Sequence, residues 1–243
     1  MTVLYGVDVS HDEVSEQEAK GLFAAGVRVF AQCLWTAAEQ PPPRVINLRN
    51  ASKAGLLIIG YISVNGSRPG AWHVTQARAG VPDDLWGQLV LRPIDVELAG
   101  IPNTTIDIAL DRNAKEGGSW LGQRRAIYTS YGHWTGQQQN TQAFKDCLLW
   151  NASWDNDPDI DFQRLPYGGW TLQQIVGEQW SGGVNVGGVF ADRNSFVSGI
   201  LLPVPVEKPA TTPISEILGQ LGRLGTRIDD IDERLKALEP GTR

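Results

Sequence analysis

Up to residue 202, the apolar positions of this 243-residue chain gather in short runs, most of them continuous rather than alternating. Continuous apolar runs of about four to eight residues are typical of strands that are covered on both faces. Amphipathic stretches at 16–25 and 45–54, each followed by a glycine, separate the first three runs and predict helices. The predicted strands cover 3–9, 27–34, 56–64, 89–96, 125–130, 147–153, 172–176 and 188–192.

The alternation of predicted strands and helices favours an α/β fold with parallel strands. Eight strands within about 200 residues fit a compact (β/α) barrel better than an open, doubly wound sheet. The later helical segments are shorter, so we expect the barrel to be irregular there. The sequence Gly6-Val7-Asp8-Val9-Ser10 stands where a dinucleotide-binding fold would carry its glycine-rich phosphate loop, which disfavours that fold.

A change of composition marks the end of the predicted barrel. Prolines recur every few residues from Pro203 to Pro213, and a segment of this kind is typical of a semi-rigid, extended linker. We therefore predict a barrel at 1–202, a Pro-rich linker at 203–213 and a separate helical segment at 214–239.

The helical segment carries an unbroken heptad pattern, which predicts a C-terminal coiled-coil helix. With the first apolar residue at position a, Arg227 and Arg234 fall at g, and Asp232 and Glu239 fall at e. The g and e residues of neighbouring parallel helices would therefore attract one another. The apolar a and d residues are Ile214, Ile217, Leu221, Leu224, Ile228, Ile231, Leu235 and Leu238.

Three glycines in this segment, Gly219, Gly222 and Gly225, each cost a helix up to about 1 kcal/mol. We therefore expect the helix to depend on partner chains, as a homo-oligomer joined through residues 214–238. Isoleucine at both a and d favours three or more strands, whereas the alternate heptads carry leucine, so a trimer is favoured over a dimer. The alternative is one amphipathic helix that folds back on the barrel.

Composition narrows the classes of function. A net charge of −6 with no basic block gives no electrostatic footprint for nucleic acid. The histidines His11, His73 and His133 are scattered, so no metal site is expected, and no cofactor is implied. Cys33 and Cys147 each lie in an apolar stretch, which favours two buried free thiols over a disulfide. The N-terminus has no basic signal-peptide region, and no segment reads as a membrane span, so we expect synthesis in the cytoplasm without a signal peptide.

Four carboxylates stand at the ends of predicted strands: Asp8, Asp95, Glu97 and Asp192. A charge at the end of a buried strand is costly unless it is paired or used. Residues two apart on a strand share a face, so Asp95 and Glu97 should project together at the mouth of the barrel where barrel active sites lie. If the barrel closes, its first and last strands are neighbours, and Asp8 and Asp192 should face that pair.

Carboxyl groups this close cannot both ionise freely, so the pKa of one should rise. An acid with a raised pKa stays protonated near neutral pH and can serve as a general acid. Clustered acids, together with nine tryptophans that suit sugar faces, point to glycoside hydrolysis, in which two acids flank the scissile bond. Asp-x-Glu alone is a weak signal, and the acids on other strands strengthen it.

Several further segments, in order along the chain, carry a resemblance to a known family. They are Tyr5-Gly6-Val7-Asp8-Val9-Ser10, Gly60-Tyr61, Ile94-Asp95-Val96-Glu97, Ile127-Tyr128-Thr129, Leu149-Trp150-x-Ala152 and Gly187-Gly188-Val189-Phe190-Ala191-Asp192-Arg193-Asn194. Over about residues 4–197 the chain resembles the glycoside hydrolase family 25 muramidases. The last segment is similar to the family's closing Gly-x-Val-Asp-x-Asn, with one residue more between Val189 and Asp192.

The resemblance implies a flattened (β/α) barrel that hydrolyses the β-1,4 bond between N-acetylmuramic acid and N-acetylglucosamine in peptidoglycan, a bacterial cell-wall polysaccharide. It implies that Glu97 is the general acid and that Asp95 stabilises or orients the acetamido group of the substrate. Asp8 and Asp192 would complete the acidic site. The aromatic residues expected to line the sugar cleft, each of which could equally belong to the core, are Tyr61, Tyr128 and Trp150.

Three segments depart from the family pattern. The loop Thr36–Arg44, with Pro41-Pro42-Pro43, does not match the family's Gly/Asp-containing segment. His11-Asp12-Glu13 stands where the family usually has Trp-Gln-Gly, and Gln173-Gln174-Ile175 stands for its late Trp-Gln-Tyr. They keep open a catalytically weak or inactive glycan-binding tail protein, structural or receptor-binding, and a barrel hydrolase of another polysaccharide. The linker and coiled coil favour an enzyme built into a phage virion or tail, with other virion proteins as partners, that acts at the extracellular cell-wall surface.

Overall fold

The structure is a computed structural model, and it describes residues 3–9, 12–38, 45–119, 121–160 and 168–202. The chain divides into two compact units, 1–202 and 203–243. The first unit coincides with the predicted barrel. The linker at 203–213, the coiled coil at 214–239 and the trimer lie outside the described residues, and they stay predictions.

The described part of the first unit contains nine strands, and eight of them close into a barrel, while β4 pairs with β3 alone. Strand β3 pairs with β2 on one side and with β5 on the other, while β9 joins β8 back to β1, so the ring has no open edge. The α/β barrel predicted from the sequence is therefore confirmed. The strands are β1 (Val3–Val9), β2 (Val29–Trp35), β3 (Leu57–Ser63), β4 (Leu89–Leu91), β5 (Ile94–Asp95), β6 (Ala126–Ser130), β7 (Leu148–Ala152), β8 (Ile175–Val186) and β9 (Val189–Val197).

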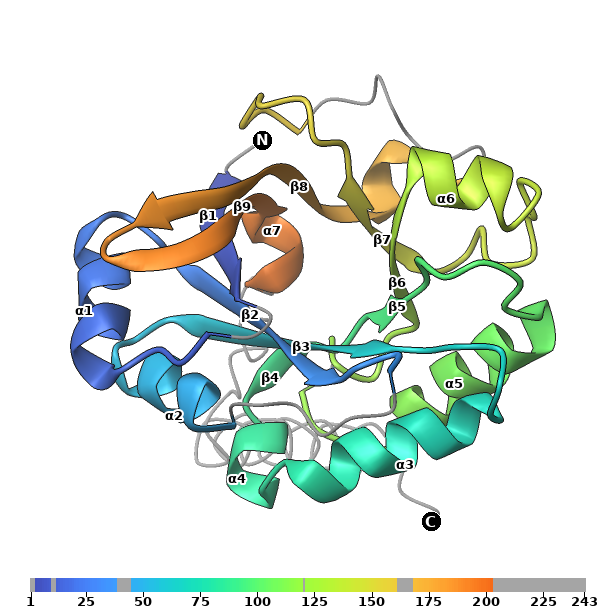
Figure 1. The fold of residues 1–243 in the computed structure, drawn as a ribbon, viewed down its shortest axis with the longest axis horizontal. Coiled ribbons are helices and arrows are strands. Elements are labelled where there is room, and N and C mark those ends of the chain that lie inside the picture. Colours follow the sequence, from blue (N-terminus) through green and yellow to red (C-terminus); the bar gives the residue numbers. More distant parts are fainter. Residues whose placement is uncertain (1–2, 10–11, 39–44, 120, 161–167, 203–243) are drawn as a thin grey trace, which may run out of the picture. The chain divides into compact units, whose positions relative to one another are not determined.

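Helices cover the outside of the first half of the barrel, whereas β8 and β9 form a long hairpin (Figure 1). The two helices expected from amphipathic stretches are confirmed as the first two of the chain. Ser15 caps the first of them. Its hydroxyl accepts from the backbone N–H of Glu18, and the Glu18 carboxylate accepts from the backbone N–H of Ser15. The helices are α1 (Glu16–Ala24), α2 (Val45–Lys53), α3 (Gly70–Gly80), α4 (Asp83–Trp86), α5 (Asn103–Lys115), α6 (Tyr131–Gly136), α7 (Ser198–Leu201) and the 3₁₀ turn η1 (Leu172–Gln174).

The expectation of parallel strands is right from β1 to β8 and wrong for β9, which runs antiparallel to both of its neighbours. The cause is a two-residue turn at Gly187 and Gly188, whose φ angles are 57° and 98°. A tight turn with two positive φ angles returns the chain alongside itself, whereas a parallel neighbour needs a long crossover. The barrel is thus mixed.

The predicted strand at 89–96 is broken in two at Arg92 and Pro93. Proline cannot donate to a strand ladder, and the fully buried Arg92 directs its guanidinium to the end of α5. There its Nε donates to Asn113 Oδ1 at 3.1 Å, and its Nη2 donates to the carbonyl of Gly117 at 2.6 Å. Because of the break, β4 pairs with the N-terminal part of β3, and β5 pairs with the C-terminal end of β3.

The predicted strand at 172–176 is wrong for its first three residues, which form η1. Thr171 donates from its backbone and its hydroxyl to Gln174 Oε1, at 3.0 Å in both cases, and this cap closes a turn in place of an extended strand. β8 therefore begins at Ile175.

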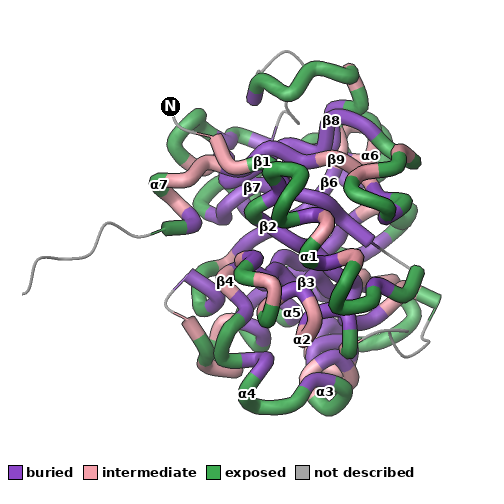
Figure 2. The backbone as a smooth tube through the Cα atoms, turned by 90° about the vertical axis from the view of Figure 1, so that its left-hand side faces the viewer, coloured by how far each residue is buried: buried purple, intermediate pink, exposed green. Residues whose placement is uncertain are grey.

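The core has two layers. Side chains of β2 alternate between them, with Val29 and Ala31 in one cluster and Phe30 in the other. Buried residues of the helices, such as Leu22, join the cluster of Phe30, so the cluster of Val29 fills the barrel interior. Figure 2 shows the strands as mostly buried within the exposed outer segments.

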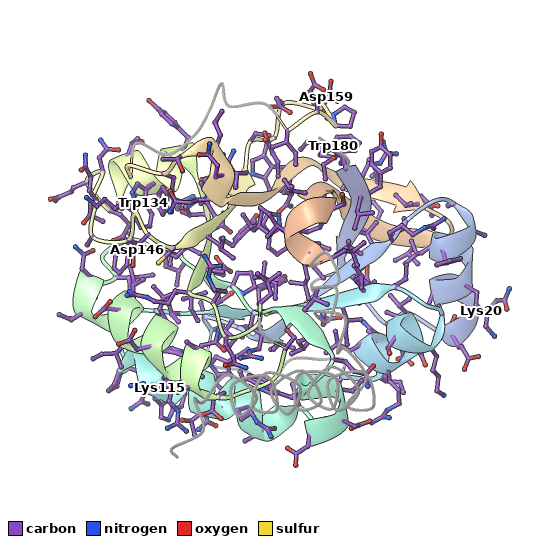
Figure 3. The ribbon with its side chains drawn as sticks, turned by 180° about the vertical axis from the view of Figure 1, so that it is seen from behind. Lys20, Lys115, Trp134, Asp146, Asp159 and Trp180 are labelled. Carbon is purple, nitrogen blue, oxygen red and sulfur yellow. The ribbon has the colours of Figure 1, made fainter. Side chains whose placement is uncertain are left out.

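Other tryptophans, and both cysteines, belong to the core. Trp134 of α6, which is labelled in Figure 3, packs edge-on against Trp170, with ring centroids 4.8 Å apart. Cys33 and Cys147 are buried free thiols, as predicted. Among the described helices, none has the length and apolar character needed to cross a membrane.

Candidate active site

The four predicted acids come together at one mouth of the barrel. A cavity of about 360 Å³ opens there, and Asp8, Asp95, Glu97 and Asp192 all line it. Because β1 to β8 run parallel, their C-terminal ends meet at this mouth, which is where (β/α) barrels carry their active sites.

Asp8 and Asp192 occupy directly opposite positions on the antiparallel strands β1 and β9. This confirms that the first and last strands are neighbours. Asp192 lies within its strand, however, and not at its end as the sequence predicted, because β9 continues to Val197. Gln179 Nε2 donates to one oxygen of Asp192 at 2.9 Å, and the backbone N–H of Gly183 donates to the other at 2.9 Å. These two donors hold the carboxylate in place.

Asp95 ends β5, between β3 and β6, and Glu97 follows two residues later. The backbone between the two acids is anchored, since Val96 N donates to the carbonyl of Tyr128 at 2.9 Å and the hydroxyl of Thr129 donates to the carbonyl of Val96 at 2.8 Å. Asp95 is buried, whereas the Glu97 side chain is 34% exposed. One acid therefore lies deep in the cavity and the other at its rim.

Burial and mutual repulsion raise the pKa of three of these acids. Burial, followed by the charge of Asp192, raises the pKa of Asp8 well above its usual range. Burial, followed by the charge of Glu97, raises the pKa of Asp95 to about 7, although a hydrogen bond from Ser63 lowers it. Burial, followed by the charge of Asp192, raises the pKa of Glu97. The site can therefore hold protons near neutral pH.

The imidazole of His133 lies at the rim, beside the acids. His133 Nδ1 lies 3.9 Å from Glu97 Oε1 and 2.9 Å from the hydroxyl of Ser130. When protonated, the imidazole favours the charged form of nearby carboxylates, and its charge acts to lower the pKa of Asp95. His133 thus opposes the effect of burial.

The three predicted aromatic residues, Tyr61, Tyr128 and Trp150, line the cavity and also form its packed floor. Trp150 is fully buried, and its ring centroid lies 4.8 Å from that of Tyr128 and 6.1 Å from that of Tyr61. Both interpretations of these residues, cavity lining and core, therefore hold for the same side chains.

The sequence analysis missed Ser63, Trp154 and Gln179, which also line the cavity. Gln179 links the aromatic floor to the acids, since it accepts from the hydroxyl of Tyr128 and donates to Asp192. No local pattern marked it, because Gln179 is a neutral residue within the buried run 175–181 of β8. By contrast, Gln174, which was compared with the family's late glutamine, lies in η1 and donates to the carbonyl of Cys147 at 3.1 Å.

Among the residues that the structure describes, no group of three or more His, Cys, Asp or Glu side chains is arranged to hold a metal ion. The donor chemistry of the site is that of carboxyl groups, an amide and hydroxyls. Such an arrangement can bind a polyhydroxylated molecule and donate a proton to it.

Comparison with known proteins supports this assignment of fold. No family model matches the chain. Over 85 residues it is 31% identical to a protein of Dictyostelium discoideum named "Probable GH family 25 lysozyme 3", and this match covers 35% of the chain and only 17% of the length of that relative.

Solved structures match over a larger part of the chain. The bacterial lysozyme from Streptomyces coelicolor gives a TM-score of 0.66 at 20% identity, over 82% of this chain and 95% of that one. The muramidase from Trichobolus zukalii gives a TM-score of 0.62 at 22% identity, over 80% of this chain and 93% of that one. These likenesses confirm the barrel fold that the sequence resemblance implied.

The raised pKa of Asp8 predicts a pH-dependent cost to stability. The folded protein holds the Asp8 proton more tightly than the unfolded chain, so the free energy of unfolding falls as the pH rises above the ordinary range of a carboxyl group. Asp8→Asn removes the buried charge, and we expect it to raise Tm at pH 8 by about 3–6 °C and to change Tm little at pH 4. Thermal unfolding across this pH range measures the effect.

The matched control is Asp84→Asn, which neutralises an exposed acid whose pKa is lowered by Arg49. This control should not stabilise the protein at pH 8. A Tm of Asp8→Asn at or below that of the wild type at pH 8 would contradict the account.

Proposed function

We propose that this protein is a peptidoglycan hydrolase that cleaves the β-1,4 bond between N-acetylmuramic acid and N-acetylglucosamine. The observation that carries the proposal is the convergence of four carboxylates, three of them with a raised pKa, on one aromatic-floored cavity. The partial match to a protein named as a family 25 lysozyme and the fold shared with a solved lysozyme and a solved muramidase support it.

Within this proposal the depth of each acid decides its role. Glu97 stands at the rim with a raised pKa, and it would donate its proton to the oxygen of the scissile bond as the general acid. Asp95 lies deeper, held by Ser63, and would orient the acetamido group of the substrate. Asp8 and Asp192 would complete the acidic site, and the Asp192 carboxylate, which is held by two donors, would stabilise positive charge that develops on the sugar ring.

Glu97→Gln tests the enzymatic assignment directly. The amide keeps the shape of the side chain and cannot donate the acid's proton, so we expect lysis of purified cell walls to fall by about 100-fold or more. The release of reducing sugar ends from peptidoglycan is the measurement.

Glu16→Gln, on the outer surface of α1, is the control and should leave lysis unchanged. Equal activity of the wild type and Glu97→Gln would contradict the assignment. Tight binding of wall fragments without turnover would instead favour the glycan-binding tail protein.

The pH profile of lysis should report His133. Because the general acid must be protonated, activity should fall as the pH rises through the range in which Glu97 ionises, and burial places the pKa of Glu97 above the usual value of a glutamate. His133→Asn removes a side chain that, when protonated, favours ionised carboxylates, so we expect this alkaline limb to move up by roughly half a pH unit. A drop in kcat at every pH with no movement of the limb would show that His133 acts only through packing.

We further propose that residues 214–238 form a homo-oligomeric coiled coil, a trimer rather than a dimer, reached through the Pro-rich segment 203–213. An enzyme arranged in this way suits a phage virion or tail in which several copies act together on the extracellular wall, beside other virion proteins. The heptad pattern of the sequence supports the oligomer.

Sedimentation equilibrium tests the oligomer. The full chain should sediment as a trimer, and a chain that ends at Leu202 should sediment as a monomer, because the apolar seam would be gone. Monomers in both cases would contradict the coiled coil.

A further inference from the structure

The β8–β9 hairpin carries a bulge beside the acidic site. Ser181 pairs with Arg193, and Val184 pairs with Ala191, so Gly182 and Gly183 together oppose a single residue, Asp192. A bulge of this kind bends its strand and re-aims the neighbouring groups. Here it turns the N–H of Gly183 to the Asp192 carboxylate, at 2.9 Å, instead of to the strand ladder.

An aromatic ring lies against each glycine of the bulge. A Cβ atom on Gly182 would stand 2.5 Å from Cζ3 of Trp154 and 3.0 Å from Oδ1 of Asp192. A Cβ atom on Gly183 would stand 3.2 Å from Cζ of Phe190. Gly183 also has a φ of +64°, which disfavours any side chain there. The two glycines therefore make a floor without side chains between two rings.

Both rings are exposed where a core role would bury them. Trp154 is 45% exposed and Phe190 is 60% exposed. Trp154 is held with a φ of +58°, which is uncommon for a bulky residue. Phe190 and Asp192 are two apart on β9, so they share a face of the strand. An exposed aromatic pair of this kind next to a cavity marks a binding surface.

We propose that Trp154, Phe190 and the glycine floor between them form a platform for a sugar ring of the glycan strand, next to the rings held at the acids. The proposal rests on the proposed function and adds a binding position to it. The occupant follows from continuity, because Trp154 and Asp192 line the acidic cavity and also contact the floor. A pyranose ring presents C–H groups to an aromatic face and hydroxyls to nearby polar groups, which this surface offers.

Phe190 is the residue to test, since it lies outside the acidic cavity. Phe190→Ala should weaken binding of glycan strands stripped of their stem peptides by about five- to tenfold. It should raise KM for these strands while kcat on the shortest cleavable oligosaccharide stays unchanged, and Phe190→Tyr should restore the affinity. Binding is measured in the Glu97→Gln background, so that cleavage does not consume the ligand.

Leu172→Ala is the matched control, because Leu172 is 53% exposed and lies in η1, before the start of β8. It should leave binding and KM unchanged, and Tm should barely move in either variant, as is usual for exposed positions. Wild-type affinity in Phe190→Ala together with normal lysis would overturn the platform and leave the proposed function intact. An effect confined to peptide-bearing walls would overturn the sugar assignment, and a protein that neither lyses walls nor binds glycan would overturn both proposals.

Discussion

The crowding of carboxyl groups at the barrel mouth is the constraint on which the site depends. Carboxylates that line one cavity repel one another, and the buried ones are poorly solvated. Each carboxyl group is therefore stable there only if it is protonated or accepts hydrogen bonds. The molecule uses both means. Asp192 receives two hydrogen bonds, whereas Asp8 and Asp95 respond with a raised pKa. Closure of the barrel forces these groups together, because each is fixed to a paired strand.

The reversed last strand gives this arrangement its particular form. A parallel strand would present an acid at its end, on a loop, whereas β9 presents Asp192 from within the strand, at its last pair with β1 and opposite the bulge of β8. Strand β8 supplies the two donors, Gln179 just before the first register shift and Gly183 within the second. The position of Asp192 is thus set by strand pairing, which is more rigid than a loop.

The apolar pattern predicted the barrel and its acids well, because strands buried on both faces leave a signal that does not depend on distant residues. Asp8 and Asp95 were found at strand ends for that reason. The hairpin was not predicted, because the alternation of strands and helices before it favours parallel strands and only the turn at Gly187 and Gly188 reverses the chain. The split at Arg92 depends on a contact with Asn113, which no local pattern announces.

Within the site, titratable residues were predictable and their supports were not. A carboxylate in an apolar run is conspicuous, whereas Gln179 is a neutral side chain whose importance appears only when it bonds Tyr128 and Asp192 together. From the sequence, the three aromatic residues could be either cavity lining or core, and in the structure they are both. Trp150 is fully buried and still lines the cavity, since the floor of a barrel site is also the top of its core.

The direction of β9 also decides where the chain leaves the barrel. Val197, its last residue, pairs with Val3 at the start of β1, at the end of the barrel remote from the acids. The short helix α7 follows, and its Leu201 packs into the cluster that fills the barrel interior. The chain therefore reaches Leu202, the last residue that the structure describes, on the side of the barrel remote from the acids.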